Sequence, residues 1–223
     1  MNNAYKIIKS YQEYFKTLKV MSDVNKIIIH DNIFISFLMT LERVDTSSYL
    51  FNVKKRNTLV DLKNVLRNIY DDKELERLIN EKIIYDMIIN LKEEDVIDFK
   101  FNEIKSISQI IKLKITTGSI LFHRQRVIEV DLNNGIIKVD DKQKENISYE
   151  DINYLVSLIN ASHFECWQDG YFNRFIKDGH QWKIEIIDKK SKELIFTGSN
   201  SYPIFYGYIR QIIDYCSFLT LDK

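Results

Sequence analysis

The stretch VIEVDLNNGIIKVD, residues 127–140, carries the clearest structural signal in this chain. Apolar and polar residues alternate on both sides of Asn133-Asn134-Gly135, and a period of two is typical of a half-buried strand. Asn-Gly suits a tight turn because both residues tolerate a positive φ. The stretch therefore predicts a β-hairpin.

Similar patterns surround this hairpin. QIIKLKIT, residues 109–116, alternates like a strand, and HQWKIEIID (180–188) and ELIFTG (193–198), joined by KKSK, predict a second hairpin. Ser148 is placed to cap a helix through about residue 159, with Asp151 completing a weaker capping box. A last helix is expected from about residue 203 to 218. Its apolar face contains Phe205, Ile209, Ile212, Cys216 and Leu219.

The N-terminal half has a different character, because residues 1–117 contain neither glycine nor proline. Such a stretch favours helices over tight turns. Apolar residues with helical spacing predict helices near residues 4–21, 58–70 and 72–91. The segment between the first two is ambiguous: residues 27–29 fit a buried strand, and residues 33–41 fit either a strand or a buried helix, of which we favour the helix. We therefore expect an α+β protein with a mainly helical region over residues 1–97. We expect residues 98–223 to form an α+β module of two hairpins and two helices.

Composition narrows the possible partners. Lys plus Arg and Asp plus Glu each number 32, so no net charge attracts the chain to nucleic acid or to an anionic membrane. No apolar run is long enough to span a bilayer, and the N-terminus lacks the apolar core of a signal peptide. We expect a cytoplasmic protein of a low-GC bacterium or its phage, with Cys166 and Cys216 as reduced thiols.

Enzyme signatures are sparse. No P-loop, dinucleotide-binding or zinc-protease motif occurs, so no cofactor is expected. His163 and Cys166, with His180, are too few for a structural zinc site, so no metal is expected either. One alternative is a metal-dependent nuclease or hydrolase in which Asp178 and Asp188 hold magnesium and Lys190 stabilises charge.

A second alternative is a nucleic-acid-binding regulator. Two basic clusters, Lys54-Lys55-Arg56 and Arg124 with Arg126, lie near aromatic residues that suit base stacking. Acidic residues are interspersed along the chain, which favours a solvated surface instead.

Aromatic residues are numerous, with 13 Tyr and 13 Phe. Trp167 and Tyr171 lie in the loop before the second hairpin, and Tyr202 and Tyr206 lie around the start of the last helix. Aromatic side chains supply both cores and binding hot spots. We therefore expect an exposed patch for a protein partner here, with Tyr202 partly exposed beside Trp167 or Tyr171.

The C-terminal third resembles a module of uncharacterised proteins from low-GC and gut bacteria, on the pattern DG-x-x-W followed by G-S-N-x-Y-P. The matching residues are DGHQW at 178–182 and GSNSYP at 198–203, with W-x-x-G-Y at 167–171 as a further element. This resemblance implies no activity and no catalytic residue.

The function predicted from these observations is non-enzymatic. We expect a binding protein that docks on another protein, of the immunity or anti-defence inhibitor type. The nuclease or hydrolase and the nucleic-acid regulator remain the alternatives.

Overall fold

The computed structural model describes residues 3–17, 32–43, 62–63, 66, 83–93, 105–119, 124–173 and 179–221. The chain divides into two compact units, residues 1–103 and 104–223. The predicted boundary between residues 97 and 98 falls near the end of the first unit. Described helices dominate the first unit and a large sheet dominates the second, which confirms the α+β class.

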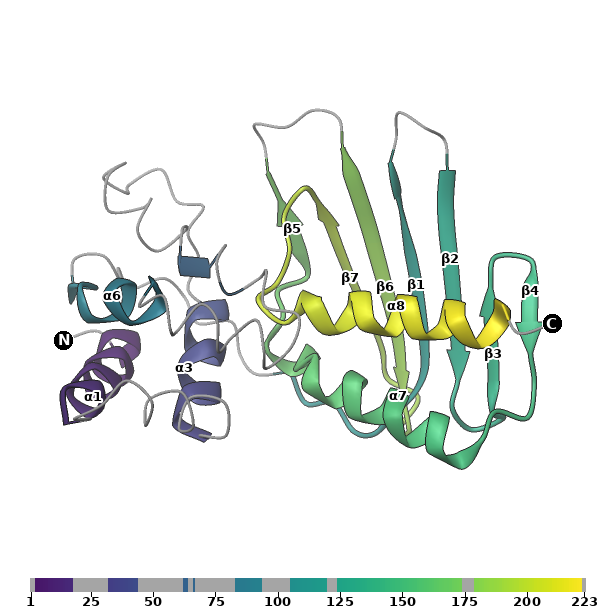
Figure 1. The fold of residues 1–223 in the computed structure, drawn as a ribbon, viewed down its shortest axis with the longest axis horizontal. Helices are drawn as coiled ribbons and strands as arrows, with labels where there is room; N and C mark the ends of the chain where they lie inside the picture. The colour runs from purple at the N-terminus through teal and green to yellow at the C-terminus, as the bar shows by residue number, and fades with distance from the viewer. Residues whose placement is uncertain are drawn as a thin grey trace. The chain divides into compact units, whose positions relative to one another are not determined.

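The first unit contains helices α1 (Asn3–Thr17), α3 (Asn32–Arg43) and α6 (Ile83–Ile89) (Figure 1). Tyr11 of α1 stacks on Phe37 of α3 with ring centroids 4.8 Å apart, and both side chains are buried. The buried amide of Gln12 donates to the carbonyl oxygens of Ile88 and Leu91 at 2.7 and 2.8 Å. It thereby joins α1 to the last turn of α6 and to Leu91, just beyond that helix. The strand predicted at residues 27–29 lies outside the described residues.

The second unit is built on a seven-stranded sheet in the order β4-β3-β2-β1-β6-β7-β5. The strands are β1 (Ile110–Ser119), β2 (Arg124–Asp131), β3 (Ile136–Val139), β4 (Lys142–Lys144), β5 (Gly170–Phe172), β6 (His180–Asp188) and β7 (Glu193–Ser199). All neighbours are antiparallel except β5 and β7.

Both predicted hairpins form, as β2–β3 and β6–β7, but they belong to one sheet. Strand β1 lies between them and pairs with β2 on one side and β6 on the other. Ile115, for example, pairs with both Ile128 and Ile184. The sheet is therefore larger than the two predicted hairpins, because β1 pairs with β6 over a long range and β5 adds a parallel edge strand.

The first hairpin turn also differs from the prediction. Asp131 pairs with Ile136, so four residues form the loop, and among them only Gly135 has a positive φ, +61°. The Asp131 carboxylate accepts the backbone N–H groups of Asn133 and Asn134, each at 3.1 Å. This side-chain bonding holds the longer loop in place of a two-residue turn.

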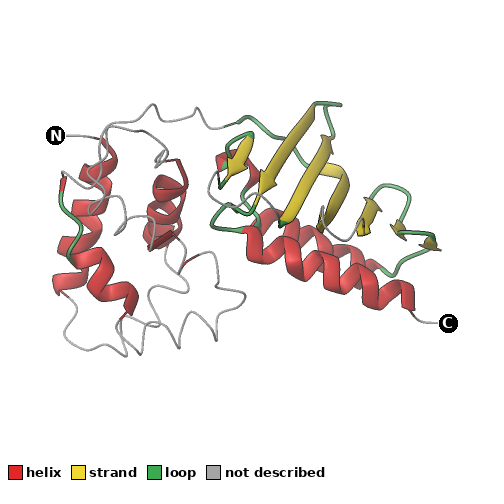
Figure 2. Ribbon diagram, turned by 90° about the horizontal axis from the view of Figure 1, so that it is seen from above, coloured by secondary structure: helices red, strands yellow, loops and turns green. Residues whose placement is uncertain are grey.

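Helices α7 (Tyr149–Ala161) and α8 (Tyr206–Leu221) pack together on one face of the sheet (Figures 1 and 2). Ser148 caps α7 as predicted, with its hydroxyl accepting the N–H of Asp151 at 3.1 Å. All five apolar residues predicted for the last helix are buried: Phe205, Ile209, Ile212, Cys216 and Leu219. That helix begins at Tyr206, after a turn that includes Pro203.

Candidate functional site

The predicted aromatic docking patch is mostly core. Trp167 is fully buried, and Tyr171 and Tyr206 are 6% and 3% exposed. The indole N–H of Trp167 donates to the carbonyl oxygen of Ser162 at 2.7 Å, and its ring meets Trp182 edge to face. These aromatic side chains fill the space between the sheet and α8. Trp167, Tyr171 and Tyr206 are therefore buried in the core and do not form the exposed patch that was expected.

Tyr202 is partly exposed, as predicted, but its side chain contacts other residues of the same unit. Its hydroxyl lies 2.9 Å from Nδ1 of His180, and Nε2 of His180 lies 2.5 Å from the Thr117 hydroxyl. The Arg210 guanidinium lies over the Tyr202 ring at 5.6 Å. Burial, with a smaller contribution from Arg210, lowers the pKa of His180, so the imidazole is held in its neutral form.

The motif that resembles the bacterial module is an interlocked structural unit. A methyl group on Gly198 would lie 2.3 Å from the Trp182 ring, so only glycine leaves room for the indole. The Trp182 N–H donates to the carbonyl of Ser201 at 2.9 Å, and the Asn200 side chain accepts the N–H of His180 at 2.9 Å. The distinctive residues of the motif thus have structural roles.

The described residues do not assemble the metal site of the predicted nuclease or hydrolase. Asp178 lies outside them, and Lys190 is exposed in the turn between β6 and β7. The buried Asp188 carboxylate accepts the backbone N–H groups of Ser108, Lys190 and Lys192, which lower its pKa to about 2. Asp188 therefore anchors a turn. No group of three or more potential metal ligands occurs among the described residues.

Only part of the predicted nucleic-acid site lies among the described residues. Lys54, Lys55 and Arg56 lie outside the described residues, as does the side chain of Arg124. The guanidinium of Arg126 donates to the Ser217 hydroxyl at 2.7 Å and lies 3.9 Å from the Asp140 carboxylate. Arg126 is thus engaged within its own unit.

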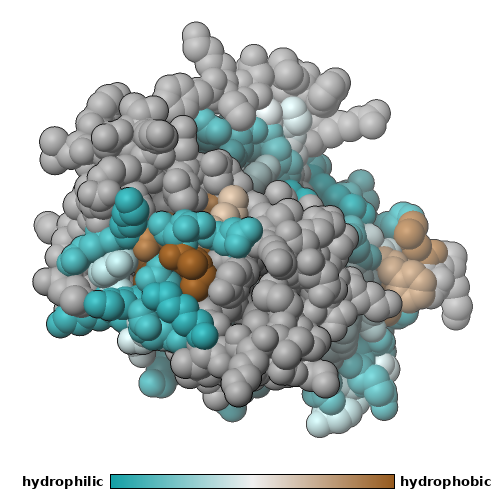
Figure 3. Space-filling view, turned by 60° about the vertical axis from the view of Figure 1, so that its left-hand side comes forward, coloured by the Kyte–Doolittle hydropathy of each residue, from teal (hydrophilic) through white to brown (hydrophobic). Residues whose placement is uncertain are grey.

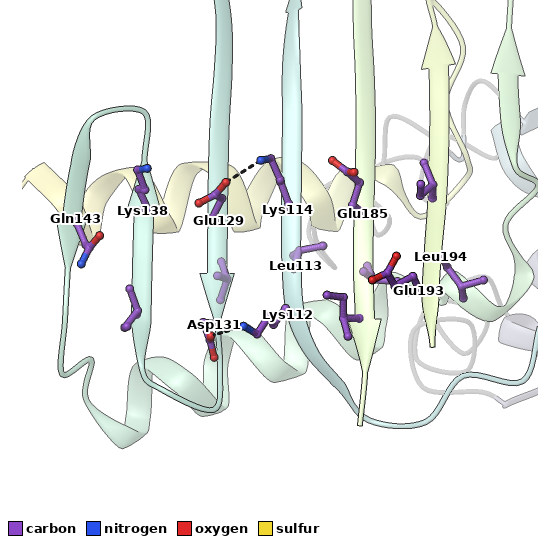
Figure 4. Close-up of a pocket in the computed structure, with 15 residues that line it drawn as sticks. Lys112, Leu113, Lys114, Glu129, Asp131, Lys138, Gln143, Glu185, Glu193 and Leu194 are labelled. Carbon is purple, nitrogen blue, oxygen red and sulfur yellow. Dashed lines mark ion pairs between the residues drawn. The ribbon is translucent and has the colours of Figure 1, made fainter. Parts of the chain in front are cut away.

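The surface best formed for contact is the open face of the sheet, which no described helix of the second unit covers (Figures 2 and 4). Because the strands are in register, side chains on this face form rows across the sheet. The glutamate row contains, from β4 to β7, Gln143, Lys138, Glu129, Lys114, Glu185 and Ile195. The aspartate row contains, from β3 to β7, Ile136, Asp131, Lys112, Ile187 and Glu193.

Charges alternate in sign along both rows and form ion pairs. Lys114 lies 2.8 Å from Glu129, and Lys112 lies 3.0 Å from Asp131 (Figure 4). The hydrogen bond between Lys114 and Glu129 raises the pKa of the lysine and lowers that of the glutamate. Burial opposes ionisation of Asp131, but hydrogen bonds from Lys112 and Asn134 outweigh it and lower the pKa. Lys114, Glu129 and Asp131 therefore stay charged at neutral pH.

Apolar side chains interrupt these charges. Ile195 is 48% exposed. Ile136 and Ile187 are partly exposed in the aspartate row, Ile136 at its β3 end and Ile187 between Lys112 and Glu193. The two rows line a shallow depression of about 430 Å³. Toward the other end of the strands the face becomes mostly uncharged, with hydroxyl and amide side chains of Thr116, Thr197, Ser199, Gln125 and Gln181.

The sequence prediction named none of the open-face residues as a site. Their signal is the placement of charged residues at every second position of KLK (112–114), EVD (129–131) and KIE (183–185). That pattern shows which residues share a face of one strand, but the rows depend on the register between strands.

Other surfaces offer less. Among the residues coloured in Figure 3, hydrophobic ones gather in small areas that hydrophilic residues border. Phe218 and Leu221 near the end of α8 are 58% and 65% exposed. Within the described part of the chain, no helix is both long and apolar enough to cross a membrane.

The chain matches no protein-family model, no curated protein and no solved structure. The resemblance to the bacterial module stays a prediction, and the function rests on the geometry of the site.

Proposed function

We propose that this protein is a non-enzymatic binding protein that contacts another protein through the open face of its sheet. The observation that carries the proposal is the composition of that face. Apolar side chains, Ile195 foremost, lie among charges of which Lys112, Lys114, Glu129 and Asp131 form ion pairs. A protein interface combines apolar contact area with satisfied polar groups in this way.

The charges of the face favour a protein over a nucleic acid. The open face carries equal numbers of positive and negative side chains. They are the four lysines Lys112, Lys114, Lys138 and Lys183 and the four carboxylates Glu129, Asp131, Glu185 and Glu193. A phosphate backbone would meet as many repulsive as attractive groups here, whereas nucleic-acid affinity depends on an excess of cations. A protein surface of alternating charge would find a complementary partner on this face.

The expected biological class, an immunity or anti-defence inhibitor of a bacterium or phage, stays a prediction. Proteins of that class act by covering a surface of another protein, and a rigid sheet face suits this mode of action because it loses little conformational freedom on binding.

A photo-crosslinking amino acid at residue 195 tests the proposal in cells of the native host. The matched control places the same amino acid at Tyr149, which is 74% exposed on α7, in the helix layer on the other face of the sheet. We expect covalent protein adducts from position 195 that position 149 does not give. No adduct at 195, or the same adducts from both positions, would refute the open face as the docking surface.

A further inference from the structure

The open face has a charge pattern that complements itself. Consider a second copy rotated by 180° about an axis that runs parallel to the strands, in front of the open face and midway between β1 and β2. The open face of the second copy then faces the open face of the first, and its strands follow in the reverse order. Strand β1 then lies opposite β2 of the second copy, β6 opposite β3, and β7 opposite β4. Each row stays opposite the same row, because the axis runs along the strands.

In the glutamate row this rotation sets opposite charges against each other. The row reads Lys138, Glu129, Lys114, Glu185 from β3 to β6. Reversal places Lys114 opposite Glu129 of the second copy and Lys138 opposite Glu185 of the second copy. Every charge between β3 and β6 in this row therefore faces a charge of the opposite sign.

The aspartate row gives the same result with different residues. Reversal places Lys112 opposite Asp131 of the second copy. It also places Ile136 opposite Ile187 of the second copy, so an apolar side chain meets an apolar one beside the charged pair. The same rotation about one axis therefore satisfies two rows independently.

We propose that the partner of the open face is a second copy of this chain, bound face to face about this two-fold axis. The inference rests on the proposed function, since it names the occupant of the same surface. A two-fold interface uses one patch on both subunits, so the patch must complement itself. The alternating rows meet that requirement.

The expected dimer is weak. Strands lie about 4.8 Å apart in a sheet, and each residue advances about 3.4 Å along its strand. From these spacings we estimate that the two open faces overlap over about 500 Å² on each copy. The total of about 1,000 Å² is near the lower limit for a specific interface. Because the strands of two packed sheets cross at about 30°, opposed residues of the two copies align best near the two-fold axis. Lys114 and Glu129 lie there.

Sedimentation velocity tests the proposal on the full chain, from about 1 to about 200 µM to cover a weak association. We expect the wild type to shift from one chain mass, 26.6 kDa, toward twice that mass as concentration rises. Lys114→Glu and Glu129→Lys should each remain monomeric, because each places like charges across the axis. Lys190→Glu, an equal charge change in an exposed turn, should dimerise like the wild type.

The equimolar mixture of Lys114→Glu with Glu129→Lys separates contacts between chains from contacts within one. Each variant alone keeps a like-charge pair within its own sheet, but across the axis of a mixed dimer both opposed pairs are restored. We expect the mixture to dimerise. Circular dichroism checks that both variants are folded.

The outcomes distinguish the two proposals. A wild type that is monomeric at all concentrations, or a folded mixture that stays monomeric when the wild type dimerises, would overturn the second-copy assignment. In that case adducts to a different protein from position 195 would leave the proposed function intact. Absence of any adduct at 195 would remove both.

Discussion

Gly198→Ala is the most direct perturbation of the packing that holds the second unit together. Gly198 lies on β7, and its α-carbon faces the indole of Trp182 on β6, which is 3% exposed. A β-carbon at position 198 would lie 2.3, 2.4 and 2.4 Å from Cε2, Cζ2 and Nε1 of Trp182. These distances are far inside van der Waals contact, so the indole or the strand must move.

The expected cost follows from what that movement disrupts. Overpacking a well-packed core destabilises by about 1–3 kcal/mol. The indole also donates to the Ser201 carbonyl and packs against Tyr171 and Tyr206, so moving it weakens a hydrogen bond worth about 1 kcal/mol. We expect Gly198→Ala to lower the free energy of unfolding by about 2–4 kcal/mol.

Urea unfolding followed by circular dichroism measures this cost. The matched background is Trp182→Phe, because phenylalanine lacks the indole atoms that approach position 198. In that background Gly198→Ala should cost much less, giving a coupling energy of about 1 kcal/mol or more in the double-mutant cycle. An equal cost in both backgrounds would show that the Trp182 contact is not the reason for glycine at this position.

Three further predictions concern the second unit. Backbone hydrogen bonds hold the pKa of Asp188 at about 2 in the folded state, below the value of about 3.9 in an unfolded chain. The ionised Asp188 therefore stabilises the fold fully above about pH 4, and this stabilisation is lost as the pH falls toward 2. Asp188→Asn should therefore destabilise the fold at pH 7 and flatten the loss of stability between about pH 4 and 2; an unchanged slope would contradict this role. Asn200 has a φ of +51° and accepts the His180 N–H, so Asn200→Gly should cost about 1 kcal/mol in urea unfolding and Asn200→Ala about 1 kcal/mol more. Equal costs would argue against backbone strain. The Tyr215 hydroxyl on α8 donates to the Asp151 carboxylate on α7. Tyr215→Phe should therefore lower the free energy of unfolding by about 1 kcal/mol. An unchanged free energy of unfolding would show that this surface hydrogen bond contributes nothing to stability.

Local structure in the second unit could be predicted because its signals are local. The alternation around Gly135, the capping by Ser148 and the apolar stripe ending at Leu219 each depend on residues close in sequence. The pairing of Ile115 with Ile184 does not. It depends on two segments nearly 70 residues apart, and no feature of either strand specifies which neighbour it joins.

Trp167 is buried in the core, and its sequence context could not show this for a physical reason. A cluster of aromatic residues near a helix start has the same composition whether it forms a docking patch or a core, because both uses exploit the same large apolar area. Burial decides between them, and burial depends on α8 covering this part of the sheet. The open face was missed because its alternating Lys and Glu residues are also typical of a solvated strand face.

One cross-linking measurement tests the self-association of the open face most directly. A photo-crosslinking amino acid replaces Ile195 in purified protein, and equal amounts of ¹⁴N- and ¹⁵N-labelled chains are mixed so that mass spectrometry identifies links between chains. Because the two-fold arrangement places β7 opposite β4, we expect mixed-isotope links from residue 195 to residues 142–144. Links confined to one chain, or links to α7 and α8 of the second copy, would contradict the face-to-face dimer.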